Sequence, residues 1–309
     1  MDGLVIIDKP SGKTSHDVVT EVKKVLKAEK VGHAGTLDPL ATGVLPVMIN
    51  EGTKLSPFLV TDTKEYRATI LLGMRTDTQD ITGNILSEAI PDVREDEVVR
   101  AIESLVGVRQ QVPPAYSAVK FKGKPLYRWT RRGVAVSPKP RTVEVFHVAM
   151  VVMDRPRVTF SVSCSKGTYI RSLCTDIGEA LGCGAALYAL RRTRSGSFSE
   201  EAALVLDGLT DEGKRERLIS ALIPLDEAIS GLKAVYVDAP LARKIREGAQ
   251  LTGEELRDDH IPFLDLGDMV RLVSLETGLV AVVEMLCGTK EIGNSGMNEQ
   301  VARTLRVFK

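Results

Sequence analysis

Residues 158–181 read VTFSVSCSKGTYIRSLCTDIGEAL, a stretch in which the period of the apolar side chains changes halfway. In the first half they alternate with polar ones, which indicates a strand with one buried face: Val158, Phe160, Val162 and Cys164. After the turn Lys166-Gly167-Thr168 they recur at helical spacing: Leu173, Ile177 and Leu181. Gly182 is typical of the position where such a helix ends. The stretch therefore predicts a strand followed by a helix.

Elements of both kinds continue toward the N-terminus. A short apolar run predicts a buried strand at residues 4–7, and periodicity predicts a strand at residues 65–72 and helices at residues 15–26 and 95–106. Thr14 or Ser15 can cap the first of these helices, and Gly107 is expected to stop the second. Strands and helices are mixed without a regular β-α-β rhythm. This favours an α+β fold, with a largely antiparallel mixed sheet flanked by helices.

The character of the chain shifts near Ser230-Gly231. Beyond this point the sequence predicts a short helix and then mostly strands, at residues 241–247, 270–274, 279–285 and 304–308. A chain of 309 residues is also too long for one ordinary core. We therefore expect two domains, residues 1–230 and residues 231–309, the second a small β-barrel-like module.

Composition excludes several classes of protein. The chain is 43% hydrophobic and 27% charged, as in soluble globular proteins, and no apolar run approaches the roughly 18 residues of a membrane helix. The N-terminus lacks the layout of a signal peptide. The four cysteines and four histidines are scattered, so we expect no disulfide framework, no metal site and a cytoplasmic location.

Charge is balanced overall but unevenly distributed along the chain. The 41 basic residues equal the 41 acidic ones, which would argue against a nucleic-acid partner. Residues 104–143, however, contain nine bases and no acid, and Tyr116, Phe121, Tyr127 and Trp129 are interleaved with them. Such runs are often solvated faces or flexible loops. Bases with stacking aromatics and no compensating acid favour a surface that clamps nucleic acid.

Three further stretches could carry chemistry. Residues 32–43, GHAGTLDPLATG, place Asp38-Pro39 in a predicted type I turn, where Asp38 is either a structural Asx-turn residue or a carboxylate available as nucleophile or base. Residues 164–171 place Tyr169 and Arg171 at the junction of a strand and a helix. Residues 190–196, LRRTRSG, form a basic run whose simplest interpretation is a solvated turn.

Taken together, these stretches carry a resemblance that none of them carries alone. The sequence closely resembles the bacterial tRNA pseudouridine synthase B (TruB) family. The matching segments follow in the same order and spacing: Leu4–Asp17, Gly32–Gly43, Lys64–Asp77, Tyr116-Ser117-Ala118, Cys164–Gly182 and Leu190–Thr193. The C-terminal module resembles the PUA domain, an RNA-binding β-barrel.

The resemblance implies an isomerase that converts uridine 55 in the T loop of tRNA to pseudouridine, without metal or cofactor. Asp38 matches the essential aspartate that attacks the nucleoside, by a route that the sequence leaves open. Arg171 matches its salt-bridge partner, expected to lower the pKa of Asp38 and to hold it by a bidentate contact. Tyr66 matches the tyrosine that stacks on the target base and helps to remove the C5 proton.

Further positions match residues that bind the RNA. Tyr169 and Leu190 match residues of the base pocket, and His33 matches the histidine that fills the space left by the flipped base. Lys9 and Pro10 are expected to support the aspartate loop. The basic window matches an insertion that closes over RNA and is expected to be mobile without it: Lys120, Lys122, Lys124, Arg128, Arg131 and Arg132.

The partners implied are the T arm of tRNA and no obligatory protein, with the chain acting as a monomer. Two alternatives stay open. One is the related guide-RNA-dependent pseudouridine synthase, whose catalytic core is similar. The other is an RNA-binding or RNA-folding module without catalysis, against which the intact Asp38, Tyr66 and Arg171 argue.

Overall fold

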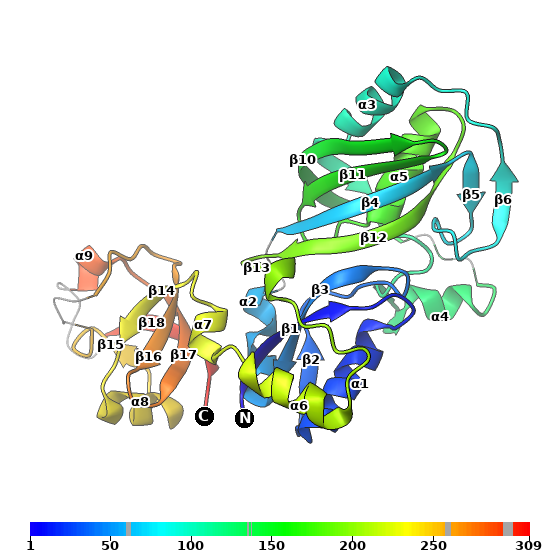
Figure 1. The fold of residues 1–309 in the computed structure, drawn as a ribbon. Coiled ribbons are helices and arrows are strands. Elements are labelled where there is room, and N and C mark those ends of the chain that lie inside the picture. Colours follow the sequence, from blue (N-terminus) through cyan, green and yellow to red (C-terminus); the bar gives the residue numbers. More distant parts are fainter. Residues whose placement is uncertain (60–62, 135, 137, 257–260, 293–298) are drawn as a thin grey trace.

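The structure is a computed structural model that describes residues 1–59, 63–134, 136, 138–256, 261–292 and 299–309. Positions 135 and 137 of the predicted basic insertion lie outside the described residues. Figure 1 shows two groups of strands with helices around them. The described strands form one nine-stranded sheet, one five-stranded sheet and two small hairpins.

The large sheet has the order β1-β3-β12-β4-β11-β10-β7, with β2 paired to β3 and β13 paired to β12. Its strands are β1 (Gly3–Lys9), β2 (Val31–His33), β3 (Thr42–Ile49), β4 (Lys64–Leu72), β7 (Gly107–Gln111), β10 (Arg141–Asp154), β11 (Arg157–Cys164), β12 (Ala185–Ser195) and β13 (Phe198–Ser199). All their pairings are antiparallel except that of β3 with β12. The predicted α+β class with a largely antiparallel mixed sheet is therefore confirmed.

The parallel contact joins the two halves of this sheet. It pairs Thr42 with Arg191 and Gly43 with Arg192, at the point where the loop that carries Asp38 enters β3. Gly43 has a φ of 98°, and a Cβ there would lie 2.2 Å from the carbonyl oxygen of Arg192. Only glycine permits this close approach. The basic run at residues 190–195 is thus part of a strand, and the prediction of a solvated turn there was wrong.

Helices cover one face of the strands β4, β10, β11 and β12, where α3 packs on β10 and α5 on β4 and β12. The described helices of this part are α1 (Ser15–Leu26), α2 (Ser56–Leu59), α3 (Glu95–Glu103), α4 (Leu126–Thr130), α5 (Ile170–Ala180), α6 (Asp211–Ser220) and α7 (Leu225–Ala228), with 3-10 turns η1 (Asn50–Leu55) and η2 (Glu200–Ala202). Thr14 caps α1 as predicted, because its hydroxyl accepts a hydrogen bond from the Asp17 backbone. The helix predicted to run to Val106 ends at Glu103, and Gly107 begins β7 instead.

Two short hairpins complete this part of the chain. They consist of β5 (Met74–Thr76) with β6 (Ile85–Glu88), and of β8 (Lys120–Phe121) with β9 (Lys124–Pro125). The first hairpin follows β4, and the loop between its strands carries Asp80, which forms an isolated β-bridge with Leu187 of the large sheet. The second lies in the basic insertion, directly before α4. Only the loop of the first hairpin is thus shown to contact the large sheet, and among the described residues neither hairpin extends it.

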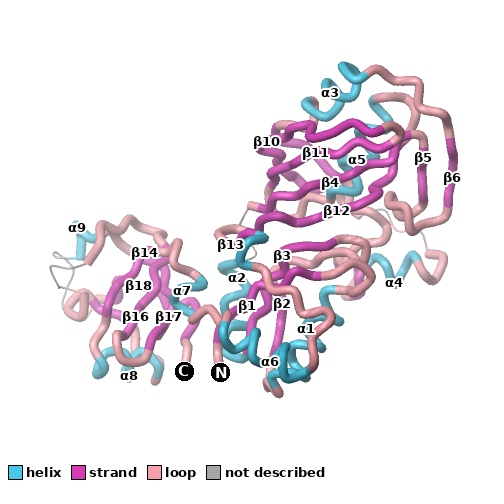
Figure 2. The backbone as a smooth tube through the Cα atoms, in the orientation of Figure 1, coloured by secondary structure: helices cyan, strands magenta, loops and turns pink. Residues whose placement is uncertain are grey.

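The C-terminal sheet is curled and has the order β14-β16-β17-β18-β15. Its elements are β14 (Lys233–Tyr236), α8 (Ala239–Arg246), β15 (Leu251–Thr252), β16 (Met269–Ser274), β17 (Gly278–Met285), α9 (Thr289–Ile292) and β18 (Gln300–Val307). The last strand starts four residues before the predicted one. Each sheet has its own apolar cluster, and a third cluster between them joins Leu4 and Met48 to Val282 and Phe308. Both chain ends lie at this seam, as Figure 2 shows, and each bonds to Glu51.

Candidate active site

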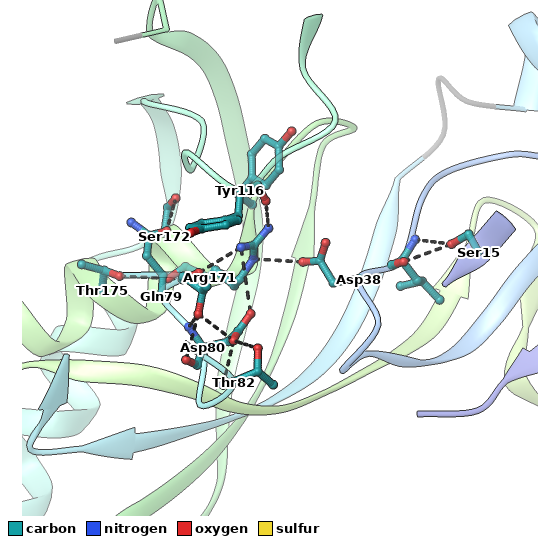
Figure 3. A network of polar contacts seen from close by, with 12 residues as sticks. Ser15, Asp38, Gln79, Asp80, Thr82, Tyr116, Arg171, Ser172 and Thr175 are labelled. Carbon is teal, nitrogen blue, oxygen red and sulfur yellow. Dashed lines mark hydrogen bonds and ion pairs between the residues drawn. The ribbon is translucent and has the colours of Figure 1, made fainter. Parts of the chain in front are cut away.

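The loop between β2 and β3 carries Asp38 at the first position of a turn. The Ala41 backbone N–H donates to the Asp38 carbonyl at 3.0 Å, with Pro39 at the second position as predicted. The buried ammonium of Lys9 donates to the carbonyls of Lys13 and Pro39, which supports the expectation that Lys9 underpins this loop. Ser15 exchanges two hydrogen bonds with the backbone of Leu37 (Figure 3). The backbone is thus held on both sides of Asp38.

Arg171 links Asp38 to two other segments. It stands in the first turn of α5, is 4% exposed, and places Nε 2.9 Å from Oδ2 of Asp38 (Figure 3). Its other nitrogens donate to the carbonyls of Thr78 at 2.9 Å and Tyr116 at 2.8 Å. The Nε–H bond is poorly aligned with the carboxylate, so the contact with Asp38 is an ion pair through one nitrogen. The predicted bidentate contact was wrong, because the second edge of the guanidinium is occupied by backbone carbonyls.

A second carboxylate, Asp80, lies behind Arg171. Its Oδ2 is 4.0 Å from Nη1 of Arg171, and its Oδ1 accepts from the hydroxyls of Thr78 and Thr82 and from the Thr82 backbone. Asp80 is 6% exposed. One arginine therefore faces two carboxylates: Asp80, whose Oδ1 accepts three hydrogen bonds, and Asp38, which opens into a cavity.

The pKa of Asp38 is raised above its ordinary value. The largest cause is burial, which penalises the charged form; Arg171 opposes it, and the negative charge of Asp80 adds to the rise. The Asp38 side chain is nevertheless 37% exposed, because it opens into a cavity while protein surrounds it on the other sides. Arg171 lowers the pKa of Asp38, as expected, but burial outweighs the ion pair and the net shift is upward.

Two cavities meet at Asp38. The smaller, of about 220 Å³, is lined by Lys64, Tyr66, Tyr169, Leu190 and Arg192, among others. The larger is a groove of about 600 Å³, lined by His16, His33, Tyr116, Tyr127 and Arg131, among others. Both also contact Asp38, Ser117 and Arg171. We call the first the base cavity and the second the groove.

The walls of the base cavity combine two tyrosines and apolar side chains with several cations. Tyr66 lies on β4, where it pairs with Val162 of β11 and Arg192 of β12, and burial raises its pKa. Tyr169 precedes α5, burial also raises its pKa, and Gln111 bonds to both its backbone N–H and its carbonyl. Leu190 is 8% exposed. A flat, uncharged ring fits this enclosure.

Comparisons with known proteins show which family this chain belongs to. Residues 23–170 match the family model of the TruB family pseudouridylate synthase N-terminal domain, and residues 171–230 match that of the tRNA pseudouridylate synthase B C-terminal domain. The chain belongs to the TruB family. It is 50% identical to tRNA pseudouridine synthase B of Syntrophus aciditrophicus, over 100% of this chain and 99% of that protein. The relative from Geobacter sulfurreducens is 42% identical over 100% of both chains.

The fold of this TruB-family chain also matches solved structures. One chain of a Cbf5-Nop10-Gar1 complex aligns with a TM-score of 0.73 and 30% identity, covering 99% of this chain and 85% of that one. A chain of an archaeal box H/ACA sRNP Nop10-Cbf5 complex aligns with a TM-score of 0.72. The likeness covers both sheets, since nearly the whole chain is aligned.

The predicted histidine lies in the groove and outside the base cavity. His33 ends β2, and its Nδ1 is buried without a hydrogen-bond partner among the described residues. Burial lowers its pKa, and the nearby charges of Arg192 and His16 lower it further. A neutral imidazole beside the entrance of the base cavity suits a place next to a displaced base.

The six basic residues predicted to meet phosphates are all exposed: Lys120, Lys122, Lys124, Arg128, Arg131 and Arg132. Among the described residues, none of the six has a carboxylate within ion-pair distance. Lys122 lies over Phe121, Lys124 over Trp129 and Arg131 over Tyr127, with the cations 5.6–5.9 Å from the ring centroids. Of the six, Arg131 also lines the groove. The mobility expected for this insertion stays a prediction.

Sequence reasoning assigned no role to several residues that the fold brings to the site. Asp80 faces Arg171, and Gln111 bonds to the backbone of Tyr169. Arg192 is fully buried and donates hydrogen bonds to the carbonyls of Gly35 and Val44. The run Thr78-Gln79-Asp80-Ile81-Thr82, an acid between two hydroxyls, was a usable signal for Asp80. Ser117 was noted only as part of a matching motif.

Proposed function

We propose that this protein isomerises uridine 55 in the T loop of tRNA to pseudouridine, with Asp38 as the nucleophile. The observation that carries the proposal is the position of Asp38. It is ion-paired to Arg171 and opens at the point where the base cavity, with Tyr66 and Tyr169 in its walls, meets the groove that Arg131 lines. The activity is that of an isomerase, because atoms are rearranged within one nucleotide.

The chemistry breaks the bond between C1′ and N1, turns the uracil in place, and forms a bond between C1′ and C5. The proton on C5 is then lost and N1 gains one, so that the nucleotide keeps its composition. Because Asp38 lies where the base cavity and the groove meet, we infer that it acts on the sugar, as the carboxylate of a retaining glycosidase does. Arg171 opposes the effect of burial and keeps a population of the carboxylate ionised.

The target uridine must leave its stack to reach Asp38, at a cost of a few kcal/mol. Tyr66, Tyr169 and Leu190 then enclose the extruded base, and His33 stands beside the space that the base leaves. Burial raises the pKa of Tyr66, so its phenol is neutral in the free protein and stacking is the role we assign to it. Phosphates of the T arm meet the six exposed cations of the insertion.

We extend the proposal to the organisation of the chain. Residues 1–230 would form the catalytic domain, and residues 231–309 a PUA-like RNA-binding domain, each around its own sheet and apolar cluster. The protein would act in the cytoplasm as a monomer, on the T arm of tRNA, without guide RNA or protein partner. No helix in the described part of the chain is long and apolar enough to cross a membrane.

The test is pseudouridine mapping after incubation with a tRNA transcript or an isolated T-arm stem-loop, with no guide RNA added. Wild type should form one pseudouridine, at position 55. Asp38→Asn should lose at least about 10⁴-fold in rate while binding RNA normally, because the amide has the size of the carboxylate but cannot attack. A need for guide RNA would favour the guide-dependent alternative, and wild-type-like turnover by Asp38→Asn would refute the assignment of the nucleophile.

A further inference from the structure

Ser117 carries a buried hydroxyl at the wall shared by the base cavity and the groove. The residue is 4% exposed, and its Oγ has no hydrogen-bond partner among the described residues. The neighbouring Tyr169 hydroxyl is close enough for Ser117 to oppose the rise in the Tyr169 pKa, but the two do not form a well-oriented bond. Buried hydroxyls are nearly always paired, so an unpaired one at a cavity wall indicates a partner that arrives with a ligand.

The backbone holds Ser117 firmly in place. The carbonyl of Tyr116, one residue earlier, accepts from Arg171 at 2.8 Å, and the carbonyl of Ser117 accepts from the Tyr127 backbone at 3.2 Å. The first contact ties Ser117 to the arginine that also faces Asp38. The second ties it to α4 of the basic insertion. The unpaired hydroxyl is therefore fixed relative to both the nucleophile and the insertion.

The position of Ser117 indicates which part of a nucleotide it meets. It lines both the base cavity and the groove, as Asp38 does. If the base occupies the base cavity and the sugar-phosphate chain lies in the groove, the ribose lies between them. Residues that line both cavities therefore face the ribose. Within an RNA chain the 3′ and 5′ oxygens are esterified, which leaves the 2′-hydroxyl as the one free hydroxyl of that sugar.

We propose that the Ser117 hydroxyl forms a hydrogen bond with the 2′-hydroxyl of the target uridine. The proposal rests on the proposed function, since it places the target ribose beside Asp38. The 2′-hydroxyl adjoins C1′, and in glycosyl transfer hydrogen bonds to the hydroxyl at that position strengthen in the transition state. The contact also distinguishes RNA from DNA at the reacting nucleotide. Ser117 is thus a substrate-contacting residue supplied by the insertion.

The test is a cycle of two proteins and two substrates. Wild type and Ser117→Ala are assayed for kcat/KM on a T-arm stem-loop with either uridine or 2′-deoxyuridine at the target position. Removing the 2′-hydroxyl should slow wild type about tenfold, as should Ser117→Ala on the ribose substrate. The two changes together should cost little more than either alone, because both remove the same bond.

Controls separate this role from a structural one. Ser274→Ala removes an equally buried serine from the C-terminal sheet and should keep the full wild-type penalty for the deoxy substrate. If Ser117→Ala melts at a lower temperature, Ser117→Cys preserves the packing with a weak hydrogen-bonding group and enters the same cycle.

Two outcomes would overturn the contact: equal 2′-deoxy penalties in wild type and the Ser117 variants, or no penalty in wild type. A wild type that forms no pseudouridine at all in the ribose substrate would instead refute the proposed function.

Discussion

Replacing Arg171 with lysine tests whether the geometry of the guanidinium, and not its charge alone, builds this site. Arg171 makes contacts of 2.8–2.9 Å in three directions, to the carboxylate of Asp38 and to the carbonyls of Thr78 and Tyr116. A lysine ammonium is a point charge that can keep the ion pair but cannot span both carbonyls. A hydrogen bond from a charged donor contributes about 1.5–3 kcal/mol, less where water can reach the acceptor. Losing two partly buried ones predicts a loss of about 2–4 kcal/mol in the free energy of unfolding.

The same substitution should lower the single-turnover rate about 100-fold, because small misplacements of reacting groups carry penalties of that size. Urea unfolding measures the stability, and rapid-quench pseudouridylation of a T-arm stem-loop measures the rate. Arg109→Lys is the matched control. Its ion pair with Asp176 lies at 3.2 Å with the arginine 26% exposed, and its loss should change stability by less than about 1 kcal/mol. If Arg171→Lys unfolds like wild type and turns over within threefold of it, the reasoning fails.

Further predictions concern charge and packing. Asp80→Asn should shift the acid limb of the profile of kcat/KM against pH to lower pH. The charge of Asp80 contributes to the raised pKa of Asp38, and the ionised carboxylate is the active form. An acid limb at the wild-type position would contradict this. Asp38→Asn should become more stable relative to wild type as pH rises through the raised pKa of Asp38. The wild-type carboxyl stabilises the fold in its protonated form and loses that contribution when it ionises, whereas the amide does not titrate. Melting temperatures that change in parallel with pH for the two proteins would argue against it. Lys122→Gln with Lys124→Gln should reduce the slope of log Kd against log salt in filter binding by about 0.7–0.9 per lost phosphate contact. Lys24→Gln, which removes an exposed cation already paired with Asp211, should leave that slope unchanged. Phe308→Ala should cost about 3–5 kcal/mol in urea unfolding because the ring is fully buried at the seam, against about 0.5 kcal/mol or less for the exposed Leu275→Ala.

Local periodicity predicted the elements that have one buried face. The strands β4 and β11 and the helices α1 and α5 lie where alternation or helical spacing placed them, and β1 lies where a short apolar run placed it. The strand β3 gave no such signal, because residues 43–49 are all buried and so do not alternate. The strand β12 was not predicted, because its arginines are typical of a solvated turn. Arg191 is ion-paired with Asp8 and Glu200, and Arg192 is 1% exposed, so charges that indicate a solvated turn lie inside a sheet.

The site residues that lie within segments matching the family were predictable one by one. Asp38, Tyr66, Tyr169 and Leu190 were named through a family resemblance and line the base cavity together. The pairing of Asp38 with Arg171 also followed from that resemblance. The contacts of Arg171 with Thr78 and Tyr116 could not be predicted, because they join segments far apart in the chain through backbone carbonyls, which leave no mark in the sequence. The lowering effect of Arg171 on the Asp38 pKa followed from the resemblance, but the larger effect of burial did not, since burial is a property of the assembled cavity.

The arrangement around Arg171 explains how a nucleophile with a raised pKa can still serve. Burial alone favours the protonated form of Asp38, and a bidentate ion pair would favour the ionised form but occupy both of its oxygens. Arg171 instead gives Asp38 one nitrogen and uses its remaining donors on backbone carbonyls, while Thr78 and Thr82 satisfy Asp80. One oxygen of Asp38 is thus held by Arg171, and the carboxylate still opens toward the cavity. Since the Tyr116 carbonyl bonds to the same guanidinium, the basic insertion and the carboxylate of Asp38 contact one side chain.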